Sequence, residues 1–374
     1  MKRTLLFGAD VVPTESNFSA FIAGDAAALL GSALLSRWLA ADARVLDLEC
    51  VLFDGEAPIP KNGPALKAPE ACAAGIAALK PNYAVLANNH ILDHGEAGLS
   101  RTMALLRGAG IWTLGAGETL SKAAKPRILT VGGVRVGLYA CAEHEFSVAA
   151  ETSAGANPFD ALETPDHVRA LKKDCDVLVA LYHGGREHYP YPTPLLQKRL
   201  RKLVSSGADL VLCQHGHCVG CFERYQTGVI VYGQGNFLFD APDGEPCWDE
   251  GLLVELTLDA DKTVDFIPLA RAPGGVRLAE GRAAQSTLDG FFRRSEEIQT
   301  PGFIEKTFAE YAKKTAQRTA AVLLGDSILL RGANVLTGRK PLGRLYGRRA
   351  RLALVNHLEC ESLREMLTEA LKRV

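Results

Sequence analysis

Short runs of consecutive apolar residues, alternating with helical patterns, most constrain what this chain can fold into. The runs are rich in Val, Leu and Ile and are bounded by Gly, Pro or Asn, which suits strands covered on both faces. They lie at residues 4–8, 43–48, 83–87, 127–131, 134–140, 176–182, 209–213 and 229–232. Helical spacing of apolar residues occurs between many of them, at residues 26–41, 70–79, 98–108 and 194–205. The alternation predicts an α/β protein.

Two segments predict antiparallel pairs within this α/β pattern. Val131 and Val134 flank two glycines, which is typical of a two-residue hairpin. Residues 255–258 and 263–267 form a second pair of short apolar runs. We therefore expect mixed sheets rather than one purely parallel sheet.

The character of the chain changes after about residue 271. A Gly, Ala and Arg-rich stretch leads into helical patterns at residues 288–298, 304–324 and 360–374. We expect one domain over residues 1–275 and a helical C-terminal extension over residues 276–374. Residues 327–358 contain no Asp or Glu, and residues 327–351 carry several Arg and Lys. This basic segment is either a solvated helix face or a contact for an anionic glycan, a phospholipid surface or a partner.

Composition excludes several classes of function. The net charge is −1, so no global field favours nucleic acid, and we expect none as a partner. The start, MKRTLLFGAD, has too short an apolar stretch for a signal peptide or a membrane span, and we expect a cytoplasmic protein. Nine scattered cysteines are typical of small buried residues, and Cys218 and Cys221 are expected to be reduced thiols. Neither a Gly-x-Ser-x-Gly motif nor a Walker loop is present.

Metal-binding and proton-carrying side chains gather where five predicted strands end. In open α/β sheets, sites form at the carboxyl ends of strands, so these groups are expected to meet at one edge. The groups are Asp10, Glu49, Asn89 with His90, His183, and His215 with His217. Two carboxylates, one amide oxygen and three imidazoles suit Mn, Fe, Zn, Ni or Co. The set is large enough for two divalent ions that share a bridging carboxylate and activate a water for attack on phosphorus.

Two local patterns refine this hypothesis. Gly216 lies between His215 and His217 and is expected to let the backbone turn, so that both imidazoles face one space. His90 follows Asn89 and is the candidate general acid for the leaving group. Asp93 either orients the His90 ring or caps the helix that follows, and both interpretations stay open.

Four residues in predicted loops are candidates for contact with a substrate. Arg186 has a side chain that suits phosphate, and Glu187 follows it after the strand that ends at His183. Lys61 and Lys67 lie in a loop that could cover the cleft. The set Glu143, His144 and Glu145 is interpreted as a polar loop that either lines the cleft or only faces solvent.

Several sequence blocks resemble the capsule-synthesis branch, the CapA or PGA-cap type, of the calcineurin-like metallophosphoesterases. The blocks are GAD, DLE, LANNHILDHGEAGLSRTMALLRGAGIWTLGAG, LYHGG, GADLVLCQHGHCV and IVYGQGNFLFD, in order over residues 2–272. The resemblance implies a four-layer α/β/β/α sandwich with a dinuclear metal site at the rim of the sheets. It implies that Asp10 and His217 bind one metal, that Glu49 bridges, and that Asn89, His183 and His215 bind the second. Asn236 would border the site as a substrate-binding residue.

The chain departs from the family pattern at four positions. Many relatives have Asp-x-His in the first block, whereas Asp10 is followed by two valines, which puts one metal in doubt. Glu49 stands in place of the more usual aspartate, and Asn88 in place of glycine. Asp47 stands where the branch often has asparagine, and a buried Asp47 could support a metal ligand from outside.

The leading prediction is a metal-dependent phosphoesterase in capsule, exopolysaccharide or poly-γ-glutamate biosynthesis. Its substrate would be a phosphorylated small molecule or a glycan- or lipid-linked intermediate, and its partners would be polymer-synthesis proteins. Two alternatives stay open. One is a non-catalytic metal-binding scaffold or regulator, and the other is a metal-dependent γ-glutamyl amide hydrolase. Metal identity, substrate, monoesterase or diesterase preference and oligomeric state are not determined by the sequence.

Overall fold

The structure is a computed structural model that describes residues 3–240, 247–259, 262–319, 332, 336 and 347–371. It divides into two compact units, Met1–Ile304 and Glu305–Val374. The first unit therefore continues past residue 275, where we expected a boundary, and includes one further helix, Gly281–Glu297. Most of the basic segment 327–351 lies outside the described residues.

The first sheet of the compact unit is mixed and has eight strands among the described residues. Its strands are β1 (Thr4–Val12), β2 (Ala43–Leu48), β5 (Tyr83–Val85), β6 (Trp112–Leu114), β15 (Asn236–Phe239), β16 (Glu250–Thr257), β17 (Val264–Ala272) and β18 (Gly275–Leu278). They lie in the order β18-β17-β16-β1-β2-β5-β6, with β15 also beside β1. The strands β1, β2, β5, β6 and β15 run parallel, so their carboxyl ends share one edge. The strands β16 to β18 are antiparallel.

The second sheet has six strands in the described part of the chain. They are β8 (Arg127–Val131), β9 (Val134–Ala142), β11 (Val177–His183), β12 (Leu210–Gln214), β13 (Phe222–Tyr225) and β14 (Gly228–Val231). The order is β13-β14-β12-β11-β9-β8, with a parallel centre and antiparallel edges. Gly132 and Gly133 both have positive φ, 58° and 89°, and form the predicted hairpin turn between β8 and β9. Two short pairs lie outside these sheets: β3 (Val51–Leu52) with β4 (Lys67–Ala68), and β7 (Ala116–Gly117) with β10 (Gly155–Ala156).

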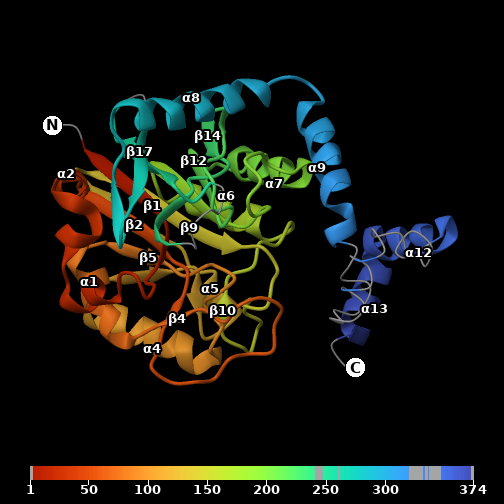
Figure 1. The fold of residues 1–374 in the computed structure, drawn as a ribbon, viewed down its shortest axis with the longest axis horizontal. Helices are drawn as coiled ribbons and strands as arrows, with labels where there is room; N and C mark the ends of the chain where they lie inside the picture. The colour runs from red at the N-terminus through yellow and green to blue at the C-terminus, as the bar shows by residue number, and fades with distance from the viewer. Residues whose placement is uncertain are drawn as a thin grey trace. The chain divides into compact units, whose positions relative to one another are not determined.

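Helices cover the outer faces of the two sheets (Figure 1). The helices of the compact unit are α1 (Phe18–Ala23), α2 (Ala26–Ala40), η1 (Glu70–Cys72), α3 (Ala73–Ala78), α4 (Gly95–Gly108), α5 (Leu120–Ala123), α6 (Thr164–Lys172), α7 (Pro194–Ser205) and α8 (Gly281–Glu297). The last of them, α8, contacts β17 of the first sheet and β13 of the second. The remaining helices are α9 (Phe303–Thr319), α12 (Arg348–Glu359) and α13 (Glu361–Leu371). Among the described residues, none of these helices is long and apolar enough to cross a membrane.

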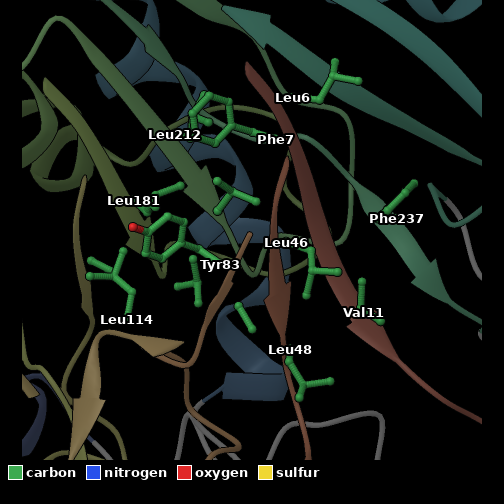
Figure 2. Packing of buried hydrophobic residues seen from close by; sticks show 14 of the residues in the cluster. Leu6, Phe7, Val11, Leu46, Leu48, Tyr83, Leu114, Leu181, Leu212 and Phe237 are labelled. Carbon is green, nitrogen blue, oxygen red and sulfur yellow. The ribbon is translucent and has the colours of Figure 1, made fainter. Parts of the chain in front are cut away.

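The core lies between the sheets, where side chains from both inner faces pack together. Phe7 and Leu46 from the first sheet belong to the same buried cluster as Leu181 and Leu212 from the second (Figure 2). A separate cluster packs the outer face of the second sheet against α6 and α7. Full burial of one such apolar side chain stabilises the fold by about 1.5–3 kcal/mol. The result is the predicted four-layer α/β/β/α sandwich.

The structure corrects three local expectations. The first strand does not end at residue 8, because β1 continues to Val12 through a register shift between Asp10 and Val11. Asp10 therefore lies within a strand rather than after one. The helix expected at residues 26–41 contains a non-helical residue, Gly31, with φ 68°. The pattern at residues 70–79 begins as a 3₁₀ turn before α3.

Candidate metal centre

The polar side chains predicted at strand ends come together at one edge of the sandwich. Each position is supplied by a strand of one sheet or by the loop that follows it. Three groups of buried residues place one ligand atom each within 4.8 Å of one another. These groups are Glu49 with His183 and His215, Asp10 with Glu49 and His217, and Asp10 with Asp47 and His183. Because Glu49 belongs to the first two groups, it stands between two clusters of ligand atoms.

His183, at the end of β11, contacts side chains carried by the other sheet. Its Nδ1 atom donates to Asp47 Oδ2 at 3.0 Å. Its Nε2 atom lies 3.0 Å from Asn89 Oδ1 and 3.3 Å from Glu49 Oε1. The Asp47 bond leaves Nε2 as the nitrogen that faces the cluster.

Asp10 and His217 form the other part of the cluster. His217 Nδ1 lies 3.4 Å from Asp10 Oδ2 and 2.9 Å from Asn236 Oδ1. Asn236 pairs with Asp10 across β15 and β1, which explains why both side chains reach His217. The backbone N–H of His215 donates to Asp10 Oδ2 at 3.3 Å. Asn236 is therefore in contact with the cluster itself.

The turn after β12 differs from the one we expected. Left-handed backbone conformations occur at His215 and His217, with φ 93° and 51°, whereas Gly216 does not have a positive φ. Non-glycine residues rarely adopt this conformation, which costs of order 1–3 kcal/mol and occurs mainly at functional sites. The unfavourable conformation therefore occurs at the two histidines and not at the glycine between them. With this backbone, both imidazoles lie at the cluster.

Several buried atoms of the cluster lack a hydrogen-bond partner among the described residues. They are both carboxylate oxygens of Glu49, Asp10 Oδ1, His215 Nδ1 and Asn236 Nδ2. Asp10 and Glu49 are fully buried. A buried carboxylate oxygen that accepts no hydrogen bond is costly, and a cation would satisfy it. The donor set therefore fits divalent metal ions.

Mutual charge effects within the cluster are strong. Burial raises the pKa of Asp47 to about 7, although His183 opposes this effect. Burial would also raise the pKa of Glu49, but His217 and His183 lower that pKa to about 2. Burial lowers the pKa of His217, yet Glu49 and Asp10 raise it to about 9. Protonated imidazoles thus compensate the buried carboxylates within the cluster, a role that divalent cations would also fill.

His90 and Asp93 form a buried pair beside this cluster. His90 Nδ1 donates to Asp93 Oδ2 at 2.6 Å, and Asp93 is fully buried. The N-cap of α4 is His94, and Asp93 does not cap that helix. Of the two interpretations of Asp93, the structure therefore shows the one in which it orients the imidazole. The bond to Asp93 thus occupies the Nδ1 atom of His90.

The four loop candidates lie in different environments. Lys61 Nζ contacts Asp93 Oδ1 at 2.5 Å. Lys67 is the first residue of β4 rather than a loop residue. It donates to the Gly55 carbonyl at 2.9 Å and pairs with Glu56 in the loop that precedes β4. Arg186 is exposed, and Glu187 Oε1 lies 3.9 Å from His215 Nε2. Of these four residues, Lys61 contacts the candidate catalytic pair and Glu187 approaches the candidate ligand His215.

Two residues outside the predicted ligand and catalytic sets contribute to the site. The sequence leaves open whether the loop with Glu145 lines the cleft or faces solvent. In the structure, Glu145 Oε1 lies 3.9 Å from His215 Nε2 and Oε2 accepts from Asn89 Nδ2 at 3.4 Å, so this loop lines the cleft. Asn88 donates to Asp47 Oδ1 at 2.8 Å and accepts from the His90 N–H at 3.2 Å. The only sequence signal for Glu145 was an acid after a strand, and that pattern is too common to be specific.

The two-sheet sandwich and the buried ligand set at its edge have the arrangement expected of the calcineurin-like metallophosphoesterase fold. Residues 5–241 match the family described as "Bacterial capsule synthesis protein PGA_cap". The chain belongs to this family.

Relatives of known name agree with this assignment. The chain is 30% identical over 192 residues to "Capsule biosynthesis protein CapA" of Bacillus anthracis, covering 49% of this chain and 46% of that protein. It is 31% identical over 241 residues to "Probable polyglutamine synthesis accessory protein" of Mycobacterium tuberculosis, covering 60% and 63%. The chain thus spans less than two thirds of the length of these relatives.

The solved 5'-nucleotidase precursor of Thermus thermophilus is similar at 15% identity and a TM-score of 0.45, covering 78% of this chain and 59% of that one.

Proposed function

We propose that this chain is a metal-dependent phosphoesterase of the CapA type, acting in capsule, exopolysaccharide or poly-γ-glutamate biosynthesis. The observation that supports this proposal most strongly is the environment of Glu49. Its carboxylate is fully buried, neither oxygen has a hydrogen-bond partner among the described residues, and it belongs to two adjacent ligand groups. A carboxylate in this position suits a bridge between two cations.

The proposed ligands follow the two groups that share Glu49. Asp10 and His217 would hold one ion, and Asn89, His183 and His215 would hold the other. Two divalent ions of Mn, Fe, Zn, Ni or Co would activate a water for attack on phosphorus and stabilise the developing negative charge. Asp47 keeps His183 Nε2 directed to the cluster through its bond to Nδ1. Asn236 supports His217 in the same manner.

The chain's own proton carrier would be His90. Asp93 holds its Nδ1 proton, so its Nε2 atom would give a proton to the leaving oxygen.

The test is elemental analysis of the purified chain, followed by a panel of phosphomonoesters and phosphodiesters with Mn²⁺, Ni²⁺ or Zn²⁺. The proposal expects bound metal and metal-dependent hydrolysis that Glu49→Gln abolishes. Metal without hydrolysis of any ester supports the alternative, a non-catalytic scaffold or regulator, which the name "accessory protein" of one relative favours. Hydrolysis of γ-glutamyl oligomers instead of phosphoesters supports amide hydrolysis.

We also propose that the basic segment 327–351 contacts anionic lipid or lipid-linked intermediates near the polymer-synthesis proteins. In its described part, Arg349 and Arg351 are exposed, and Leu352 on the same helix, α12, is 60% exposed. Basic residues beside apolar ones favour an anionic membrane surface. Sedimentation with phosphatidylserine vesicles tests this, and binding that survives neutralisation of the segment contradicts it. The cytoplasmic location stays a prediction.

A further inference from the structure

An otherwise exposed loop buries one lysine beside the candidate proton carrier. Residues 53–66 connect β3 to β4 without regular secondary structure, and most of them are exposed or half-buried. The Lys61 side chain is the exception, since only 4% of it is exposed. A buried ammonium is costly unless it is paired, so the conformation of this loop depends on the partner that Lys61 finds.

Asp93 is the partner, and it connects the loop to His90. Asp93 Oδ1 accepts from Lys61 Nζ at 2.5 Å, and Asp93 Oδ2 accepts from the Leu66 N–H at 2.6 Å. The same Oδ2 accepts from His90 Nδ1. The carboxylate that orients the imidazole is therefore itself held by two donors from one loop.

Further hydrogen bonds fasten the loop to the same segment. The Ile59 N–H donates to the Asp93 carbonyl at 3.0 Å, and the Ala57 N–H donates to His94 Nδ1 at 3.1 Å. Lys61 Nζ also lies 3.3 Å from His90 Nδ1. Because an ammonium can only donate and Nδ1 already donates to Asp93, Lys61 and His90 lie side by side as two donors to one carboxylate.

We propose that Lys61 is a positioning residue for the phosphoesterase reaction, an inference that rests on the proposed function. Its ammonium fixes the Asp93 carboxylate, and Asp93 in turn fixes the orientation in which His90 delivers a proton to the leaving oxygen. Lys61 is thereby engaged within the protein rather than with the substrate. A small misplacement of a proton donor is enough to lower the rate by orders of magnitude.

If Lys61 positions the proton donor, the loss of kcat on its replacement should depend on the leaving group of the ester. Esters with good leaving groups, such as 2,4-dinitrophenyl phosphate, need little protonation, whereas phenyl phosphate needs much. Lys61→Met should lower kcat for phenyl phosphate about 10-fold more than for 2,4-dinitrophenyl phosphate, with metal content unchanged. Lys61→Arg should restore most of the loss. Adding Lys61→Met to His90→Asn should cost almost nothing further, because both act through one step.

Hydrogen exchange supplies a readout that does not depend on activity. In Lys61→Met, amides of residues 57–66 and 90–95 should exchange about 10-fold faster than in the wild type. Lys122→Met, which removes a lysine from the surface pair with Glu118, is the matched control and should change neither activity nor this exchange.

Unchanged exchange in Lys61→Met overturns the proposal. So does an equal loss of kcat across all esters, which would leave the phosphoesterase function standing. A wild-type chain that hydrolyses none of the esters instead removes the proposed function, and the catalytic role of Lys61 with it.

Discussion

His183 on one sheet and Asp47 on the other are joined by a buried hydrogen bond of 3.0 Å. β11 carries His183 and β2 carries Asp47, so the bond crosses the interface of the sandwich at the edge where the ligands gather. Asp47 also accepts from Asn88 at 2.8 Å. Side chains from both sheets thus position the candidate ligand His183, and a substitution on one sheet should change metal binding at a ligand carried by the other.

Replacement of Asp47 by Asn should weaken metal binding without unfolding the chain. The amide keeps the shape but removes the charge that holds the Nδ1 proton of His183, and such changes typically cost 10–100-fold in affinity. Metal titration by isothermal calorimetry measures it. Asp176→Asn, which removes a surface carboxylate paired with Arg135, is the control. Equal affinities for Asp47→Asn and the wild type would contradict the proposed support of His183.

Metal ions should stabilise the chain through Glu49. Binding to the folded state alone adds about 2.7 kcal/mol at a free metal concentration 100 times the dissociation constant. A chelator should therefore lower the melting temperature of the wild type, and added Mn²⁺ or Zn²⁺ should restore it. Glu49→Gln should show a much smaller metal-dependent shift in differential scanning fluorimetry. A shift of wild-type size in that variant would mean that Glu49 is not a ligand.

His90→Asn should separate catalysis from metal binding. The asparagine cannot exchange a proton, so the rate with phenyl phosphate should fall about 10²–10⁴-fold, which is the usual contribution of a general acid. Elemental analysis should find the same metal content as in the wild type, since His90 is not a proposed ligand. If hydrolysis and metal content are both unchanged, His90 is not the acid.

Glu145 and Glu187 should disfavour substrates with two negative charges. Each carboxylate lies 3.9 Å from His215 Nε2, and their side chains are 38% and 40% exposed. A phosphomonoester dianion is repelled more than a phosphodiester monoanion, and salt screens the difference. The variant with both residues changed to Gln should raise kcat/KM for 4-nitrophenyl phosphate about 3- to 10-fold relative to bis(4-nitrophenyl) phosphate. A constant ratio at low salt would exclude this selection.

Asp209 should contribute stability that depends on pH. Burial raises its pKa, but the pairs with Lys172 and Lys262 and the Leu178 N–H outweigh burial and lower the pKa below the usual value. Because the folded-state pKa is depressed, the contribution is present above the unfolded pKa of about 3.9 and is lost as pH falls through the folded value. Asp209→Asn should cost about 1–3 kcal/mol of unfolding free energy at pH 7. Urea denaturation should show that the unfolding free energies of wild type and variant converge below pH 4. A difference in unfolding free energy that stays constant with pH would contradict the proposed contribution of the Asp209 charge.

Much of the fold follows from the pattern of residues, because buried strands and amphipathic helices have distinct periods. The helix Pro194–Ser205 has the predicted bounds, since Thr193 caps it and Pro194 suits its first position. The predicted end of the first strand, at residue 8, was wrong, because pairing with β15 extends β1 past Asp10. A pairing between residues separated by more than two hundred positions leaves no local signal.

The sequence by itself determined the alternating architecture and the supply of carboxylates and imidazoles, since both depend on residue type and local period. Only the tertiary structure decided which atoms meet. It places Glu145 beside His215, buries the Lys61 ammonium against Asp93, and gives His215 and His217 their left-handed backbone. These features depend on how two sheets and a long loop pack together, and the free energy of that packing is shared among residues far apart in the chain.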